Sequence, residues 1–165
     1  MYIMVSVTLI VCIIFTLVEL IGTKMNPFVK LSKLPTDIQD RARSFTRYEE
    51  GVGKPLFIKV RTEEKIPVFV VLLTVFTGIV YVSGARNFWQ GFGCTFLMWL
   101  VVKLYVTGVL CCGWYAHTPA VWIPGTKDMV ASYQNYLFYL SSIPRSLGVG
   151  TMIGVLIGTI IQLAA

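Results

Sequence analysis

Charged residues are scarce in this chain of 165 residues. Asp, Glu, Lys and Arg together make up 13% of the sequence, whereas hydrophobic residues make up 56%. Soluble domains carry about 25% charged residues. The deficit excludes an ordinary water-exposed domain and predicts that lipid is the solvent around most of the chain.

Residues that usually build reaction or metal centres are also few. There is one histidine, His117, and the four cysteines have no CxxC spacing, which excludes the common zinc and thioredoxin-type signatures. P-loop, HExxH, GxSxG and dinucleotide-binding patterns are absent as well. We therefore predict no metal site, and the sequence indicates no particular cofactor. The cysteines are expected to act as small buried hydrophobes, with a thiol role for Cys111 and Cys112 as the alternative.

What the sequence does contain is long apolar runs. Helices that cross the hydrocarbon core of a bilayer need about 20 apolar residues. Four runs meet this requirement, at about 2–22, 66–84, 88–113 and 147–163. The first run lacks the basic start and the cleavage site of a signal peptide, so we expect it to be retained. The predicted fold is an all-α integral membrane protein, a single membrane domain over 1–165 with four transmembrane helices in a bundle.

The positions of the basic residues predict the orientation in the membrane. Of the 14 Lys and Arg residues, 10 lie between the first two apolar runs, and the connection between the second and third runs has only Arg86. Because cytoplasmic loops are enriched in Lys and Arg, segments 23–65 and 114–146 are expected in the cytoplasm, and both termini on the non-cytoplasmic side of the plasma membrane. The net charge of +6 is then explained by this topology and by attraction to the anionic headgroups of the bilayer, which are the predicted partners. Nucleic-acid binding is not predicted.

The first cytoplasmic segment has the pattern of a basic amphipathic helix. Thr36 and Gln39 have the spacing of a capping box, which marks a helix start. Leu34, Ile38 and Phe45 form a sparse apolar face. A helix of this kind is typical of the membrane interface.

The second cytoplasmic segment opens with "HTPAVWIPGTKDM", residues 117–129. Pro124 and Gly125 are a strong pair for a type II turn, and Thr126 is a candidate cap for a helix that follows. Trp122 is expected at the level of the headgroups, where amphipathic aromatic side chains are enriched.

Residues 130–145 repeat apolar side chains at helical spacing, and their tyrosines also favour the headgroup level. This pattern predicts a second interfacial helix, or the first turns of the last span with a kink at Pro144.

A structural turn leaves His117 without a role. Histidine exchanges protons near neutral pH, so His117 is the candidate catalytic acid or base, with Asp128 or Glu19 as the carboxylate that orients it. Lys127 and Asp128 are also candidates for binding a substrate or an ion. The alternative is that the whole stretch only connects two membrane helices.

Lys103 lies inside the third apolar run, where a lysine costs about 2.5–3.5 kcal/mol on insertion scales. Such a residue usually faces the interior of the bundle and finds a partner. Glu19, near the cytoplasmic end of the first run, is the other charge within a span. If the Lys103 side chain extends toward the cytoplasm, its ammonium group comes close to the membrane depth of the Glu19 carboxylate. We predict a Glu19–Lys103 pair, with separate solvation of each charge as the alternative.

The last apolar run carries small residues at intervals of four. Ser146, Gly150, Gly154 and Gly158 lie on one helical face, which allows another helix to approach closely. The pattern predicts a packing surface and leaves two partners open. One is a helix of the same chain, and the other is the last helix of a second copy in a homo-oligomer.

These features allow two classes of function. The first is a small, oligomeric membrane protein that binds or translocates a small ion or solute through Glu19, Lys103, Lys127 and Asp128, or that serves as a subunit of a larger membrane complex. The alternative is a membrane-embedded enzyme that acts on a lipid or lipid-linked substrate at the cytoplasmic interface, with His117 as the acid or base.

Overall fold

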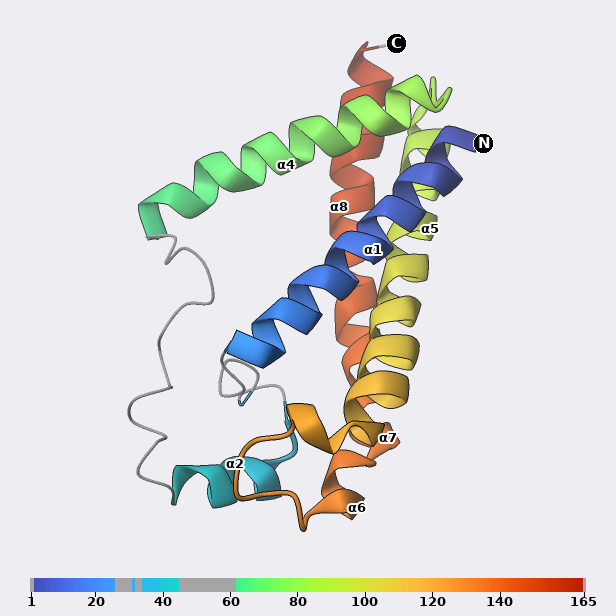
Figure 1. Cartoon of the computed structure of the whole chain (residues 1–165). Coiled ribbons are helices and arrows are strands. Elements are labelled where there is room, and N and C mark those ends of the chain that lie inside the picture. The colour runs from blue at the N-terminus through green and yellow to red at the C-terminus, as the bar shows by residue number, and fades with distance from the viewer. Residues whose placement is uncertain (1, 26–30, 32–33, 45–61, 165) are drawn as a thin grey trace. The chain divides into compact units, whose positions relative to one another are not determined.

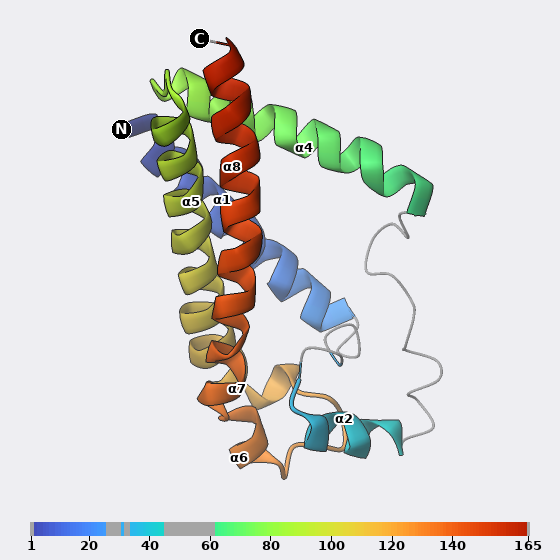
Figure 2. The same cartoon turned by 180° about the vertical axis from the view of Figure 1, so that it is seen from behind.

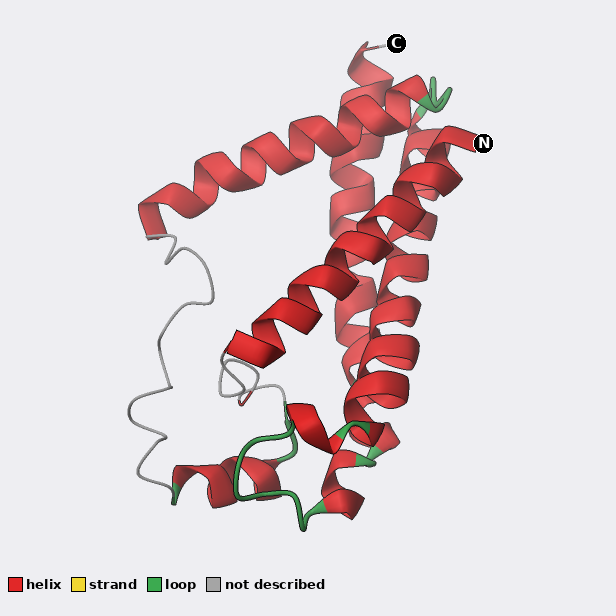
Figure 3. Ribbon diagram, viewed as in Figure 1, coloured by secondary structure: helices red, strands yellow, loops and turns green. Residues whose placement is uncertain are grey.

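The computed structural model describes residues 2–25, 31, 34–44 and 62–164, with side chains over these ranges except 24–25, 62–69, 71 and 72. Every regular element in these ranges is a helix, and no strand occurs among them (Figure 3). The elements in chain order are α1 (Tyr2–Met25), α2 (Thr36–Arg43), α4 (Thr62–Val82), α5 (Phe88–Leu104), the π-helix η2 (Tyr105–Tyr115), the 3₁₀ turn η3 (Pro119–Val121), α6 (Val130–Tyr133), α7 (Tyr136–Leu140) and α8 (Ser142–Ala164). The all-α prediction is confirmed for this part of the chain.

The chain divides into two compact units. Unit 1 consists of Met1–Ile13, Val60–Leu104 and Ile143–Ala165, and unit 2 consists of Ile14–Lys59 and Tyr105–Ser142. Two of the long helical stretches, α1 and the continuous run from α5 into η2, contribute residues to both units (Figure 1).

Three segments are long and apolar enough to cross a membrane, namely Tyr2–Thr23, Phe88–Tyr115 and Val130–Ala164. They contain three of the four predicted spans, which supports a helical membrane protein. The remaining predicted span, 66–84, falls on α4, whose described apolar part is Leu73–Val82. The count of four spans therefore stays a prediction.

In unit 1, the small residues of α8 allow α5 to lie directly against it (Figure 2). A Cβ atom on Gly150 would lie 2.4 Å from Cδ1 of Trp99, and one on Gly158 would lie 2.9 Å from the carbonyl oxygen of Phe88. Gly154, between them, faces α5 in the same way. The glycine face is therefore occupied by a helix of the same chain.

Two hydrogen bonds join the ends of this helix pair. The indole Nε1 of Trp99 donates to the carbonyl oxygen of Ser146 at 2.9 Å. At the other end, the backbone N–H of Phe88 donates to Oε1 of Gln162 at 3.0 Å, which satisfies a donor that has no partner within its own helix. The register between α5 and α8 is thus set by close backbone approach and by polar contacts at both ends.

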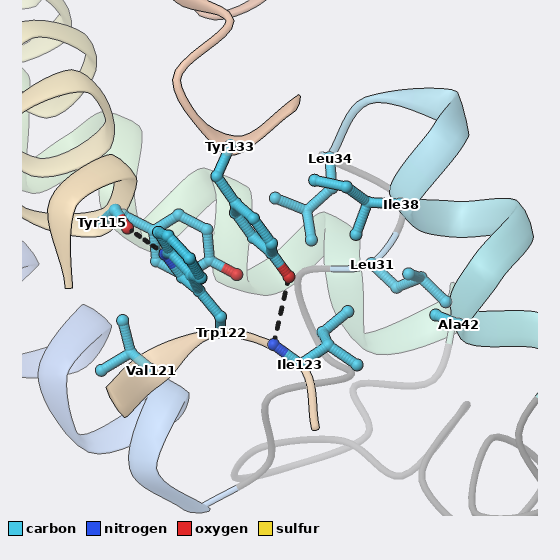
Figure 4. Packing of buried hydrophobic residues seen from close by; sticks show 9 residues of the cluster. All are labelled: Leu31, Leu34, Ile38, Ala42, Tyr115, Val121, Trp122, Ile123 and Tyr133. Carbon is cyan, nitrogen blue, oxygen red and sulfur yellow. Dashed lines mark hydrogen bonds between the residues drawn. The ribbon is translucent and has the colours of Figure 1, made fainter. Parts of the chain in front are cut away.

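Unit 2 has its own hydrophobic core (Figure 4). Its buried members are Leu31, Leu34, Ile38, Ala42, Tyr115, Val121, Trp122, Ile123 and Tyr133. Ile38 and Ala42, on one face of α2, are completely buried. Burying an isoleucine side chain contributes about 1.5–3 kcal/mol, so protein contacts stabilise this face of α2. The interfacial position of the helix stays a prediction. Phe45, the third residue of the predicted face, lies outside the described residues.

Helix α2 begins where the sequence predicts, but the predicted capping box does not form. Thr36 is the first residue of the helix, and Pro35 occupies the cap position without a side-chain hydrogen bond. Gln39 donates through Nε2 to the carbonyl oxygen of Leu34 at 2.7 Å. Pro35 has φ of −51° and ψ of 148°, outside the helical region, so the helix begins at the next residue.

The segment before α8 contains the two short helices α6 and α7. The chain is interrupted at Ser141, whose hydroxyl donates to the carbonyl oxygen of Phe138 at 2.6 Å. Pro144 lies in the first turn of α8, where its missing N–H breaks no helical hydrogen bond. The interruption that the sequence places at Pro144 therefore occurs three residues earlier.

The third span changes its winding near its end. After Leu104 the helix continues as η2 with eleven residues of π-helix, longer than the single turn in which this geometry usually occurs. Gly108 and Gly113 are five residues apart, the hydrogen-bond spacing of a π-helix, and a Cβ atom on Gly113 would lie 3.4 Å from the carbonyl oxygen of Gly108. The wider helix ends two residues before His117.

Candidate functional site

His117 is held at one ring nitrogen by the end of η2. Its Nδ1 lies 2.9 Å from the carbonyl oxygen of Gly113 and 3.1 Å from that of Cys112. Carbonyl oxygens only accept hydrogen bonds, so Nδ1 carries the hydrogen in this arrangement. In the neutral ring, Nε2 is then the atom with the free lone pair.

The other ring nitrogen faces a phenol. The hydroxyl of Tyr136 lies 3.2 Å from Nε2 of His117, so the phenol can donate to the lone pair. The two rings are nearly parallel, with centroids 6.2 Å apart and planes 20° from parallel, and both side chains are exposed. Tyr136 is the first residue of α7, whose start is fixed by the backbone N–H of Phe138 donating to Oδ1 of Asn135 at 3.2 Å.

The turn that follows His117 has the conformation that its sequence predicts. The N–H of Thr126 donates to the carbonyl oxygen of Ile123 at 3.1 Å, and Gly125 between them has φ of +88°. A positive φ at this position is the signature of a type II turn and favours glycine. Thr126, however, caps no helix. It is completely buried, and Met129 occupies the cap position of α6.

A closed hydrogen-bond network holds this turn. The hydroxyl of Thr126 donates to the carbonyl oxygen of Ile123 at 2.9 Å. Its oxygen can therefore accept from the hydroxyl of Tyr133, 2.7 Å away, while the oxygen of Tyr133 accepts the N–H of Ile123 at 3.2 Å. All the polar atoms of this buried ring of contacts are satisfied, as buried polar groups require.

Trp122 belongs to the core of unit 2. Its ring stacks on that of Tyr133, with centroids 4.3 Å apart and planes 2° from parallel, and Nε1 donates to the carbonyl oxygen of Tyr115 at 2.7 Å (Figure 4). Only 4% of Trp122 is exposed. The prediction that it anchors the segment among the headgroups is therefore wrong, because an acceptor for its N–H and a partner for its ring are both found inside the protein.

The exposed pair Lys127 and Asp128 follows the turn. Asp128 forms an ion pair with Arg41 of α2, with 3.6 Å between Oδ2 and Nη2, and both side chains are more than half exposed. Such a pair contributes between 0 and about 1 kcal/mol. In the described part of the chain, no hydrogen bond joins Asp128 to His117. The carbonyl oxygens at the end of η2 orient the ring in place of this carboxylate.

Glu19 and Lys103 are half-buried and belong to different units, Glu19 to unit 2 and Lys103 to unit 1. The carbonyl oxygen of Glu19 accepts the hydroxyl of Thr23 at 2.6 Å. Within unit 2, α1 is joined to the start of η2 by a hydrogen bond of 2.8 Å between the hydroxyls of Thr16 and Tyr105. The predicted pairing of Glu19 with Lys103 stays a prediction.

Sequence reasoning missed Tyr136 as a neighbour of His117. The sequence indicates that Tyr136 lies near the start of a short helix after the turn. It does not indicate the direction that the chain takes after the turn, so the contact with His117 could not be predicted. No group of three His, Cys, Asp or Glu side chains with metal-binding geometry occurs among the described residues, and the four cysteines are free.

Comparison of the chain with protein families, with curated proteins and with solved structures finds no match.

Proposed function

We propose that this protein is a multi-pass membrane enzyme that acts on a lipid or lipid-linked substrate at the cytoplasmic surface, with His117 as the proton acceptor. The observation that supports it is that both ring nitrogens of His117 lie within hydrogen-bonding distance of a partner. Nδ1 faces two carbonyl oxygens at 2.9 and 3.1 Å, and Nε2 faces the hydroxyl of Tyr136 at 3.2 Å.

This arrangement has the parts that a general base requires. A base must present a lone pair in a fixed direction and must be oriented by a third group. Here the oriented atom is Nε2 of His117, and the orienting groups are the carbonyl oxygens of Cys112 and Gly113. When Nε2 accepts a proton, positive charge spreads to Nδ1–H, where the two carbonyl dipoles stabilise it.

Tyr136 supplies the second group. In the resting state its hydroxyl donates to Nε2 and occupies the position that a substrate hydroxyl would take. Two steps are then chemically balanced. In the first, a substrate hydroxyl replaces the phenol, transfers its proton to Nε2 and bonds to an electrophilic atom of the lipid as the bond from that atom to its leaving group breaks. In the second, the phenol transfers its proton to Nε2 and the phenolate oxygen bonds to that atom as the same bond to the leaving group breaks. In both cases His117 ends as the imidazolium ion and returns the proton to the leaving group.

A lipid substrate is favoured by the place of the pair in the chain. His117 follows Phe88–Tyr115, one of the segments able to cross a membrane, by two residues. The distribution of Lys and Arg predicts that this end is cytoplasmic, where the proposed topology also places segments 23–65 and 114–146. A substrate anchored in the bilayer would present its headgroup at this level.

The test uses the purified full chain in liposomes of phosphatidylethanolamine and phosphatidylglycerol with added polyprenyl phosphate, each lipid being followed by mass spectrometry. We expect the wild-type protein to convert at least one of them. His117→Gln should lower the rate about 10²-fold or more, the usual contribution of a general base. Tyr136→Phe separates the two steps, because it abolishes conversion only if the phenolate reacts.

Arg43→Gln is the matched control, since it removes an exposed charge from α2 in the same unit and should leave the rate unchanged. Equal lipid profiles for the wild type and His117→Gln, with both proteins folded, would remove the basis for this proposal.

A further inference from the structure

Unit 1 contains a groove between α4 and α8 that is separate from the His117 site. Its volume is about 520 Å³, within the range of ligand pockets. Leu73, Thr77, Gly78 and Tyr81 of α4 form one wall, and Ile161 is among the residues of α8 that form the other. The two helices are in contact near their C-terminal ends, and α4 diverges from α8 toward its own N-terminus (Figure 2).

The surface of the groove is apolar. Two threonines, Thr74 and Thr77, line it. The hydroxyl of Thr74 donates to the carbonyl oxygen of Val70 at 2.9 Å, and that of Thr77 donates to the carbonyl oxygen of Leu73 at 2.8 Å, both within the same helix. Neither hydroxyl hydrogen is then available to a ligand. At Gly78 a Cβ atom would meet nothing within 4 Å, so this glycine leaves open space along the groove.

A fixed cation lies at one end of this apolar surface. The guanidinium of Arg86 lies over the ring of Tyr81, 4.1 Å from its centroid. Its Nη1 donates to the carbonyl oxygens of Tyr81 at 2.7 Å and Ala85 at 3.0 Å, which closes the C-terminus of α4. A guanidinium has five N–H donors, so donors remain for an anion after these contacts.

In the described part of the chain, Arg41 forms an ion pair with Asp128 and Arg43 forms one with Asp40, and neither pair includes Arg86. The sequence has no Asp or Glu between residues 65 and 127, and none before Glu19 or after Asp128. The predicted topology places Arg86 on the non-cytoplasmic side and places the acidic side chains of segments 23–65 and 114–146 on the opposite side.

We propose that the groove binds one acyl chain of an anionic phospholipid whose phosphate is bound by Arg86. An acyl chain matches a mainly apolar surface whose two threonine hydroxyls already donate to their own helix. A phosphate matches the planar guanidinium, which binds such groups through two parallel hydrogen bonds. The site is independent of the proposed chemistry at His117 and lies in a different unit.

The experiment measures lipids retained by the purified full chain in native mass spectrometry, with dioleoyl phosphatidylglycerol and dioleoyl phosphatidylcholine as competing probes. We expect the wild-type protein to prefer phosphatidylglycerol about tenfold, the effect of one hydrogen-bonded charge. Arg86→Gln should bind both lipids equally. Arg145→Gln, which removes an exposed positive charge elsewhere in unit 1, should keep the preference.

A second pair of variants tests the acyl-chain part. Gly78→Leu fills the groove and should lower retention of both lipids, whereas Gly148→Leu adds the same side chain to α8 where a Cβ atom also meets nothing within 4 Å. Because each variant is compared between two lipids, a general loss of folding is distinguished from a loss of headgroup recognition. The proposal is overturned if Arg86→Gln keeps the preference, if Gly78→Leu retains lipid like the wild type, or if Gly78→Leu instead converts a dimer to a monomer.

Discussion

The hydroxyl of Tyr136 and Nε2 of His117 lie 3.2 Å apart, although the two residues are separated by nineteen positions in the chain. The opposite side of the same imidazole faces the carbonyl oxygens at the end of η2. A phenol both donates and accepts, but a carbonyl oxygen only accepts. The two sides of the ring are therefore unequal, and this inequality determines which nitrogen can act as a base.

The first prediction concerns the tautomer of His117. Since it is the only histidine, protein labelled with ¹⁵N-histidine gives one pair of ring-nitrogen signals in an NMR spectrum. In the neutral ring we expect Nδ1 to carry the hydrogen and Nε2 to be unprotonated. Tyr136→Phe should shift only the Nε2 signal, because the carbonyl oxygens still hold Nδ1. A hydrogen on Nε2 in the wild type would contradict the arrangement.

The second prediction concerns the buried network of unit 2. Tyr133→Phe removes the acceptor of the Ile123 N–H and the donor to Thr126. A buried polar group left without a hydrogen-bond partner lowers the free energy of unfolding by about 1–3 kcal/mol. The midpoint of thermal unfolding in detergent should fall accordingly. Tyr136→Phe is the matched control, because that hydroxyl is exposed. If the two variants have equal midpoints, the network does not stabilise the protein.

The third prediction concerns the contact between α5 and α8. Gly150→Ala places a Cβ atom 2.4 Å from Trp99, and overpacking of this kind costs about 1–3 kcal/mol. Gly148→Ala meets nothing within 4 Å and should be neutral or stabilising, because alanine favours a helix over glycine by up to about 1 kcal/mol. Thermal unfolding of both variants in the same detergent gives the comparison. Equal effects would mean that Gly150 of α8 does not pack against Trp99 of α5 in solution.

Features governed by local chemistry could be predicted from the sequence. The run predicted at 88–113 corresponds to Phe88–Tyr115, because the length of an apolar segment is set by the thickness of the bilayer. The turn at Pro124 and Gly125 was equally predictable, since proline fixes its own φ and glycine readily adopts the positive φ that a type II turn requires.

Features that depend on distant partners could not be predicted. Trp122 has the sequence signature of a headgroup anchor, but its ring stacks on Tyr133, eleven residues away, and is buried. The apolar face of α2 likewise has the pattern of an interfacial helix, and it packs on protein through Ile38. An amphipathic pattern indicates that the apolar side chains need apolar neighbours. It does not indicate whether lipid or protein supplies these neighbours.

The fourth prediction concerns the number of spans. If 66–84 crosses the membrane, a reporter fused after the last residue is non-cytoplasmic, as is a reporter inserted beside Arg86. If this segment does not cross, the later spans are inverted and the C-terminal reporter becomes cytoplasmic. Paired alkaline phosphatase and green fluorescent protein fusions distinguish the two topologies, since the first is active outside and the second fluoresces inside. A fusion within 23–65 is the control and should be cytoplasmic in both.

The fifth prediction concerns Glu19 and Lys103. Removing one partner of an ion pair at low dielectric leaves an uncompensated charge, so Glu19→Gln and Lys103→Met should each lower thermal stability in lipid nanodiscs. If the residues pair, the double variant should be less destabilised than the sum of the single effects, with a coupling energy of about 0.5–3 kcal/mol.

Strictly additive effects would show that each charge is solvated separately, and the hypothesis of a shared ion- or solute-binding site would then lose its basis. Lys103→Met also separates the two classes of function. If the protein is an enzyme in which His117 and Tyr136 supply the reacting groups, Lys103→Met should leave lipid conversion intact. A loss of conversion as large as that of His117→Gln, in a variant that remains folded, would instead place Lys103 in the reaction.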